Sequence, residues 1–97
     1  MGKFVLAYKG GGMAATEEER NAAMEKWGAW FGSLGGAVTD MGNPFGGSAS
    51  VGDGGTSGLT GYSIVTAGSL DDAVSKSKDC PIFASGGNVE VYEAIPM

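Results

Sequence analysis

Histidine is absent from this 97-residue sequence, and cysteine occurs once, at Cys80. Without an imidazole the chain has neither a His general base nor a His-ligated metal. A single thiol also excludes a thiolate zinc site and an internal disulfide. We therefore expect no metal site and no cofactor. A lone cysteine is typical of a reducing compartment, so the sequence predicts a cytoplasmic protein.

Basic residues are few, and long apolar runs are missing. Six Lys and Arg stand against eleven Asp and Glu, which gives a net charge of −5. This balance argues against nucleic-acid binding, which needs a clustered positive surface. The sequence has no run of about 18 apolar residues that would span a membrane, and it shows no signal peptide. We expect one soluble domain over residues 1–97, without a nucleic-acid or membrane partner.

Glycine, by contrast, is abundant, with 19 residues that concentrate near 10–12, 42–61 and 86–87. These clusters predict loops between segments of regular structure. Four segments alternate as β-strands do: Lys3–Tyr8, Ala37–Gly42, Leu59–Ala67 and Asn88–Ile95. We expect Gly10–Gly12 to end the first strand, and Ser48–Val51 is a candidate extension of the second, before a turn at Asp53-Gly54.

Two segments predict helices, because Thr16–Glu19 and Ser69–Asp72 both have the pattern of a capping box. The first helix carries an apolar stripe about 120° wide, so we expect it to be the chief contributor to the core. The stripe consists of Ala23, Met24, Trp27, Trp30, Phe31 and Leu34. Its helical spacing assigns the tryptophans to the core rather than to a ligand. Gly35-Gly36 is expected to end this helix, and Pro81 lies beyond the end of the second.

The resulting order is βαββαβ, the ferredoxin-like α+β arrangement of an antiparallel four-stranded sheet with two helices on one face. Right-handed crossovers place both helices on the same side of the sheet. Neither face is strongly charged, since Val5, Ala7, Val65 and Ala67 oppose Phe4, Leu6, Tyr62 and Ile64. An apolar face in water would be an unusually large exposed patch. We therefore expect a homodimer in which a second copy covers it.

The sequence as a whole resembles the YCII-related family, in its DGPF-like branch. The matching stretches are KFVLAYKG, EKWGAWFGSLG, GNPFG, LTGYSIVTAGSLDDAV and CPIFASGGNVEVYEAIPM. The chain has Met-Gly-Asn-Pro-Phe at 41–45 in place of the Asp-Gly-Pro-Phe form. This resemblance implies a dimeric α/β barrel of the ferredoxin-like type.

The same resemblance suggests several functions. Some members are suspected enzymes with a His-Asp pair near the barrel pocket, and some relatives act on ring-cleavage products. Others are encoded beside extracytoplasmic-function sigma factors. The matching part of the first helix is Met24, Glu25, Lys26 and Trp27, which includes no imidazole. A His-dependent mechanism is therefore not carried over.

A few residues are candidates for a site. Asp40 is the one acid of the second strand; facing a pocket it would be a base, and in solvent an ordinary strand-end carboxylate. A second group consists of residues that suit a small-molecule pocket or its mouth: Tyr8, Asn43, Phe45, Tyr62 and Tyr92. The tyrosines lie on three strands and would converge on one sheet face, or they are ordinary strand formers. Cys80 follows a helix C-terminus, where a thiolate is not favoured, which predicts a structural role.

Three functions remain open at this point. One of them is enzymatic, so the sequence leaves open whether the protein is an enzyme. The first is a small-molecule-binding or regulatory protein, with a link to sigma-factor signalling. The second is a cofactor-free enzyme that performs proton transfer on a small organic acid, with Asp40 as base and Tyr62 or Tyr8 as the polarising group. The third is a purely structural dimer, which would have no pocket of about 300 Å³ or more.

Overall fold

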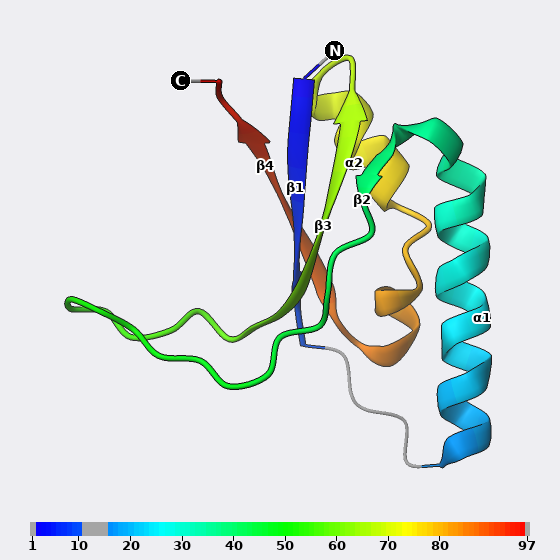
Figure 1. Ribbon diagram of the computed structural model, residues 1–97, viewed down its shortest axis with the longest axis horizontal. Helices are drawn as coiled ribbons and strands as arrows, with labels where there is room; N and C mark the ends of the chain where they lie inside the picture. Colours follow the sequence, from blue (N-terminus) through cyan, green and yellow to red (C-terminus); the bar gives the residue numbers. More distant parts are fainter. Residues whose placement is uncertain (1, 11–15, 97) are drawn as a thin grey trace.

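The computed structural model describes residues 2–10 and 16–96, which form a sheet covered on one side by two α-helices (Figure 1). The strands are β1 (Gly2–Lys9), β2 (Val38–Asp40), β3 (Leu59–Ala67) and β4 (Asn88–Ala94). The helices are α1 (Glu17–Leu34) and α2 (Leu70–Ser77), with the short 3₁₀ helices η1 (Gly35–Ala37) and η2 (Pro81–Ser85). This confirms the βαββαβ order.

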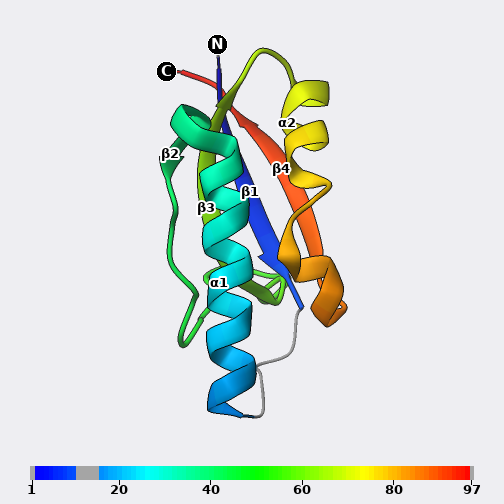
Figure 2. The ribbon, with the colours of Figure 1, turned by 90° about the vertical axis from the view of Figure 1, so that its right-hand side faces the viewer.

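The sheet has the order β2-β3-β1-β4, with β1 antiparallel to both of its neighbours and β2 antiparallel to β3. This interleaved order confirms the ferredoxin-like arrangement. Figure 2 shows α1 and α2 side by side in front of the sheet. The side chains of β3 alternate as expected, with Ser63, Val65 and Ala67 buried under the helices and Tyr62, Ile64 and Thr66 on the uncovered face.

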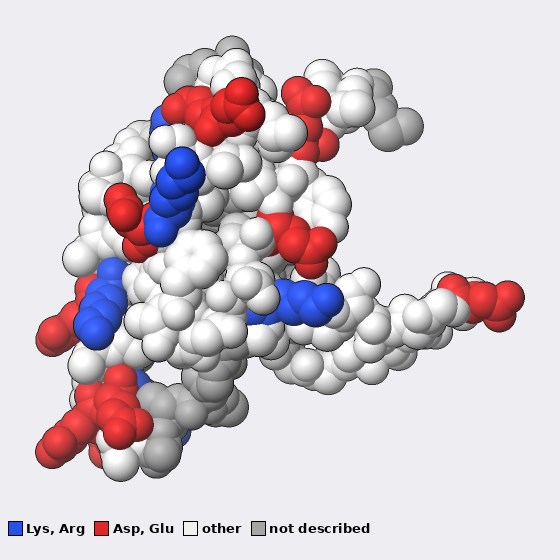
Figure 3. All heavy atoms as spheres, turned by 180° about the vertical axis from the view of Figure 1, so that it is seen from behind, with Lys and Arg blue, Asp and Glu red and all other residues white. Residues whose placement is uncertain are grey.

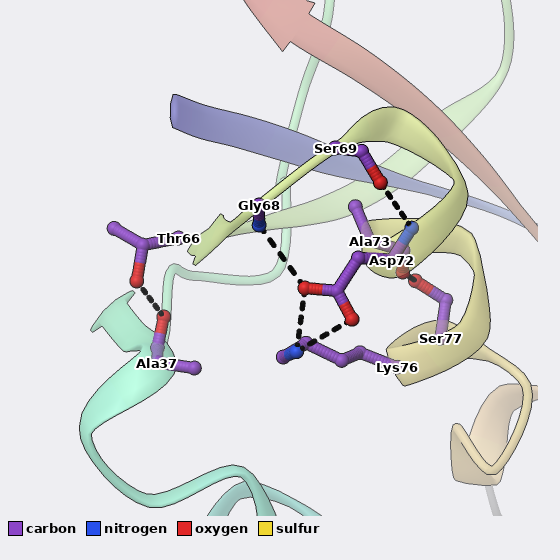
Figure 4. A network of polar contacts seen from close by, with 8 residues as sticks. All are labelled: Ala37, Thr66, Gly68, Ser69, Asp72, Ala73, Lys76 and Ser77. Atoms are coloured by element: carbon purple, nitrogen blue, oxygen red, sulfur yellow. Dashed lines mark hydrogen bonds and ion pairs between the residues drawn. The ribbon is translucent and has the colours of Figure 1, made fainter. Parts of the chain in front are cut away.

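The helix caps form as the sequence predicts. Thr16 Oγ1 accepts the backbone N–H of Glu19 at 3.1 Å, and Ser69 Oγ accepts that of Asp72 at 3.1 Å. The Asp72 carboxylate accepts the N–H of Gly68 at 3.1 Å and pairs with Lys76 Nζ at 2.9 Å (Figure 4). These bonds satisfy amide groups that the first turn of a helix leaves free. Gly35 ends α1 at φ +56°.

The core lies between the sheet and the helices, and the strands supply most of it. The most completely buried large side chains are Phe4, Leu6 and Val65, on β1 and β3. The expectation that the first helix is the chief core contributor is wrong, because Trp30 is its one buried residue in the described chain. Trp27, Phe31 and Leu34 pack against the core from its edge, while Met24 is 72% exposed. Helix α1 therefore stands partly away from the sheet.

The connection between β2 and β3 differs most from expectation. Strand β2 is shorter than predicted, and Ser48–Val51 does not extend it. Residues 46–58, here called the arm, contain the predicted turn at Asp53-Gly54 and no strand. Figure 1 shows the arm projecting from the side of the sheet opposite the helices. A glycine- and serine-rich segment has few side chains that could hold it against the sheet. Of the stop predicted at Gly10–Gly12, Gly10 follows the end of β1 directly, with φ +73°, and Gly11-Gly12 lies outside the described residues.

Candidate functional site

A cavity of about 660 Å³ lies between α1 and the sheet, beside the segment that follows β2. Its volume falls in the range of about 300–1,000 Å³ that is usual for small-molecule sites. The wall has three parts: the Met24–Phe31 stretch of α1, the sheet surface with η2, and the Met41–Pro44 segment. The cavity exists because α1 rests on its aromatic residues instead of lying flat on the strands.

The wall contributed by α1 consists of Met24, Trp27, Gly28 and Phe31. The Trp27 and Tyr8 rings form a T-shaped pair with their centres 5.1 Å apart, and the centre of the Phe31 ring lies 5.9 Å from that of Trp27. Aromatic pairs at such distances are favourable beyond simple burial. Gly28 leaves open space, since no atom lies within 4 Å of where a β-carbon would stand. This wall is apolar, with an indole N–H as its polar group.

One hydrogen bond fixes the position of α1. The indole Nε1 of Trp30 donates to the carbonyl oxygen of Lys76 on α2 at 3.3 Å. The Trp30 ring lies 4.9 Å from Phe31 and 5.7 Å from Trp27. Trp30 thus ties the two helices together and supports the residues that line the cavity.

The floor of the cavity contains a chain of two hydrogen bonds, one buried and one partly buried. The Tyr8 hydroxyl donates to Ser63 Oγ at 2.7 Å, and Ser63 Oγ donates to the carbonyl oxygen of Met41 at 2.7 Å. Tyr8 and Ser63 are both buried, on neighbouring strands β1 and β3. Burial raises the pKa of the Tyr8 phenol well above its usual range. The phenol therefore stays neutral and serves as a polar contact within an apolar cavity.

The third wall is a segment that runs alongside β3 after β2 has ended. The N–H of Phe45 donates to the Thr60 carbonyl at 2.8 Å, and the N–H of Tyr62 donates to the Asn43 carbonyl at 3.3 Å. Gly42 has φ +78°, and a β-carbon there would overlap the Tyr62 carbonyl oxygen. Only glycine allows this approach. The close contact brings the Met41 carbonyl within reach of Ser63.

Charged groups are absent from this cavity as far as the structure describes its wall. Nor do residues 2–10 and 16–96 contain a group of three or more acidic, Cys or His side chains that could hold a metal ion. None of the helices in the described ranges is long and apolar enough to cross a membrane. The cavity therefore suits uncharged molecules, and its walls offer hydroxyl groups in place of charges.

The structure brings some of the predicted pocket residues to the cavity. Tyr8, Asn43 and Tyr62 line it, whereas Phe45 and Tyr92 do not. The expectation that the three tyrosines share one sheet face is wrong. Tyr62 pairs with Ala7, so its side chain points to the face opposite Tyr8, where its ring stacks on Phe45 at 5.7 Å. Tyr92 is also on that face, 53% exposed, and it donates to Glu90 at 2.6 Å.

Asp40 lies outside the cavity. Its side chain is exposed and accepts the backbone N–H of Gly42 at 2.8 Å, which shapes the turn that leaves β2. The role of a base therefore stays a prediction that this cavity does not support. Sequence reasoning missed Met24, Gly28, Phe31 and Ser63 as wall residues. Ser63 carried a usable signal, because it is the one hydroxyl on the face of β3 that is otherwise buried and apolar.

Comparison with known proteins supports the fold. No family model and no curated protein matches the chain. Among solved structures, it is similar to 5-chloro-2-hydroxyhydroquinone dehydrochlorinase (TftG) from Burkholderia phenoliruptrix AC1100, in its complex with 2,5-dihydroxybenzoquinone. The TM-score is 0.60 at 19% identity, over 98% of this chain and 95% of that one. The likeness shows a shared α+β ferredoxin-like fold.

Proposed function

We propose that this protein binds a small, uncharged and largely apolar molecule in the cavity under α1. The observation that carries this proposal is the cavity itself, with about 660 Å³ of space beside Trp27 and Phe31 and the Tyr8–Ser63 hydrogen bond at its floor. Ligand sites are typically apolar clefts with a few placed polar groups. Aromatic walls favour a flat ring, which can stack on them or meet their edges.

The structural neighbour supports a planar ligand of this kind. That protein was solved in complex with 2,5-dihydroxybenzoquinone, a flat six-membered ring with oxygen substituents. At 19% identity the likeness concerns the fold, so the same activity is not inferred for this chain. It favours a ring compound as the first class of molecule to test.

A cofactor-free enzyme acting on a small organic acid is less well supported. A carboxylate in an apolar cavity needs a cationic partner or several donors to replace its water shell. The described wall has no Lys or Arg, and Asp40 lies elsewhere. Binding is therefore the function that the geometry favours over proton transfer.

The assembly we propose is a homodimer formed through the uncovered face of the sheet. On this face Val5 of β1 lies between Ile64 of β3 and Tyr92 of β4. Ala7 of β1 lies between Tyr62 of β3 and Glu90 of β4. Figure 3 shows the molecule hollowed between the arm and the C-terminal end, with charged side chains bordering the hollow. A second sheet packed there would cover an apolar centre with a polar rim, as is usual at stable interfaces. Membership of the YCII-related family, a link to sigma-factor signalling and a cytoplasmic location stay predictions from the sequence.

Filling the cavity from α1 tests the proposed function. Gly28 faces the cavity with open space around it, so Gly28→Leu places a side chain in the ligand volume while raising helix propensity. The neutral dye N-phenyl-1-naphthylamine brightens in apolar surroundings and serves as the probe. We expect the wild-type protein to bind it and Gly28→Leu to bind it at least about tenfold more weakly, a loss of about 1.4 kcal/mol.

Gly32→Leu is the matched control for this experiment. Gly32 is on the same helix, also has no atom within 4 Å of a built β-carbon, and does not line the cavity. Its substitution should leave dye binding unchanged. Equal dye binding by wild type and Gly28→Leu, or no dye binding by the wild type, would overturn the proposal.

A further inference from the structure

The hydrogen atoms of the cavity's hydrogen-bond chain have only one possible direction. A carbonyl oxygen has no hydrogen, so Ser63 must donate to Met41, at 2.7 Å. The Ser63 oxygen is then free to accept, and Tyr8 donates to it at 2.7 Å. The Tyr8 hydroxyl has thereby used its hydrogen, while its oxygen keeps a lone pair. The carbonyl at the end of the chain thus makes Tyr8 an acceptor toward the cavity.

The hydroxyl hydrogens of Thr60 and Ser85 are likewise donated to backbone carbonyl oxygens. The single hydroxyl hydrogen of Thr60 is shared between the carbonyl oxygens of Gly10, at 3.1 Å from Oγ1, and of Tyr8, at 3.3 Å. Ser85 Oγ donates to the carbonyl oxygen of Ile82 at 3.2 Å. Each of these side chains lines the cavity. The hydroxyl hydrogens of Tyr8, Ser63, Thr60 and Ser85 therefore point to a protein carbonyl or to Ser63, and these four groups offer a ligand oxygen lone pairs. The hydroxyl of Tyr62 belongs to a side chain directed to the opposite face of the sheet, where its ring stacks on Phe45.

Donor groups on the wall are fewer. The indole N–H of Trp27 is one, on the α1 side. Asn43 also belongs to the wall, on the Met41–Pro44 segment, and its side-chain amide has N–H donors as well as an accepting oxygen. The polar contact that the floor offers is thus an accepting one.

We propose, on the basis of the proposed function, that the molecule bound in this cavity is a neutral ring compound whose hydroxyl or N–H donates a hydrogen bond to the Tyr8 oxygen. Neutrality follows from the uncharged wall, which offers nothing to replace the hydration of an anion or a cation. Donation follows from the fixed direction of the Tyr8–Ser63–Met41 chain. The class includes phenols, naphthols and aryl amines, and it excludes aryl carboxylates and ethers without a donor.

The raised pKa of Tyr8 makes this preference independent of pH over the neutral range. Burial disfavours the phenolate, so the Tyr8 hydrogen stays on its oxygen and remains directed at Ser63. A deprotonated tyrosine would also accept a hydrogen bond, but it would carry a charge that the apolar wall does not stabilise.

Displacement of N-phenyl-1-naphthylamine by three matched bicyclic compounds tests the proposal at pH 7. These are 2-naphthol, a neutral donor; 2-methoxynaphthalene, which has the same ring without a donor; and 2-naphthoate, an anion. One hydrogen bond predicts that 2-naphthol binds about two- to tenfold more tightly than 2-methoxynaphthalene. We expect 2-naphthoate to bind at least about tenfold more weakly than 2-naphthol. Its carboxylate would lose its hydration shell in the cavity and find no cationic group to replace it.

Ser63→Ala tests the direction of the hydrogen bond. Without the Ser63 oxygen, the Tyr8 hydrogen has no protein acceptor there and turns to the cavity, so the preference for 2-naphthol over 2-methoxynaphthalene should fall to about one. Tyr8→Phe removes the oxygen altogether and should give the same loss of preference. Because the dye is itself an aryl amine, its own affinity should fall by no more than about two- to tenfold, the contribution of one hydrogen bond. This second variant gives an answer even where Ser63→Ala does not fold.

The outcomes separate this proposal from the proposed function. Equal affinity for the naphthol and its methyl ether in the wild type, tight binding of the naphthoate, or an unchanged preference in Tyr8→Phe overturns the donor proposal while dye binding still stands. Failure of the dye to bind the wild type overturns the cavity as a binding site.

Discussion

Burial decides the chemistry of Cys80, the chain's single thiol. The residue is 3% exposed and lies next to Ile82 in the core cluster. Burial raises the pKa of its thiol to about 11, because a thiolate would lose its water shell. The structural role that the sequence predicts for this cysteine agrees with that environment.

We predict that Cys80 reacts slowly with alkylating reagents in the folded protein. With a pKa of about 11, against about 8.5 for a free thiol, the thiolate fraction at pH 8 is lower by about two orders of magnitude. Iodoacetamide labelling at pH 8, followed by mass spectrometry, measures the rate. The same protein unfolded in guanidinium chloride is the control. The labelling rate of the folded protein should rise as the pH approaches 10. Equal rates in the folded and unfolded states would contradict this account.

At the scale of single residues, the sequence predicts the strand or turn to which a residue belongs better than it predicts the residues that it contacts. The structure places Tyr8 on the cavity wall, where an aromatic ring with a polar tip is a suitable lining group. Tyr62 and Tyr92 were placed on the face of Tyr8, since the sequence does not reveal the register that pairs Tyr62 with Ala7. Gly42 is visible in the sequence as a turn residue, but its contact with the Tyr62 carbonyl depends on two segments 20 residues apart.

Among the elements, α2 is the one whose stability depends most directly on pH. Asp72 accepts Lys76 Nζ and the N–H of Gly68, and these bonds lower the pKa of its carboxyl. The carboxyl thus stabilises the folded state above the ordinary Asp pKa of about 3.9. That contribution is lost as the pH falls through the lower pKa of the folded state.

We therefore predict that Asp72→Asn is less stable than the wild type at pH 7, and that the difference shrinks as the pH falls below about 4. Urea unfolding at a series of pH values between 7 and 3 measures it. Asp71→Asn removes the same charge from the same helical turn and is the control for the helix dipole. Parallel pH curves for wild type and Asp72→Asn would show that this carboxyl does not contribute.

The elements themselves could be predicted largely because their signals are local. Alternation identifies β1, β3 and β4, and a capping residue followed three positions later by an acid identifies the start of each helix. The distance between α1 and the sheet could not be predicted in this way. The apolar stripe gives the side of the helix that faces the core, but not the distance at which Trp30 and Phe31 hold it. The cavity results from that distance, so sequence reasoning did not find its α1 wall.

At the scale of the whole molecule, neither helix of the described residues covers the second face of the sheet. Its rows are apolar at the centre, where Val5 lies between Ile64 and Tyr92. Stable interfaces bury about 800 Å² on each partner, and a face-to-face pair of four-stranded sheets is able to reach that area. The neighbour shares this fold at 19% identity, so the architecture tolerates wide change in sequence.

We predict that Ile64→Lys converts the proposed dimer into a monomer. A lysine in the centre of the interface would be buried without a partner, which is strongly unfavourable. Sedimentation equilibrium at micromolar concentration measures the mass. Ser75→Lys adds the same charge to the exposed side of α2 and should leave the dimer intact. A wild-type protein that sediments as a monomer at this concentration would overturn the dimer.

The aromatic cluster on α1 has an optical consequence. The chain has two tryptophans, and both belong to this cluster, with their ring centres 5.7 Å apart. Trp27 lines the cavity and Trp30 supports it from behind. Excited at wavelengths that only indoles absorb, the protein emits solely from this corner of the molecule. Its intrinsic fluorescence is therefore a label-free signal of whether the cavity is filled.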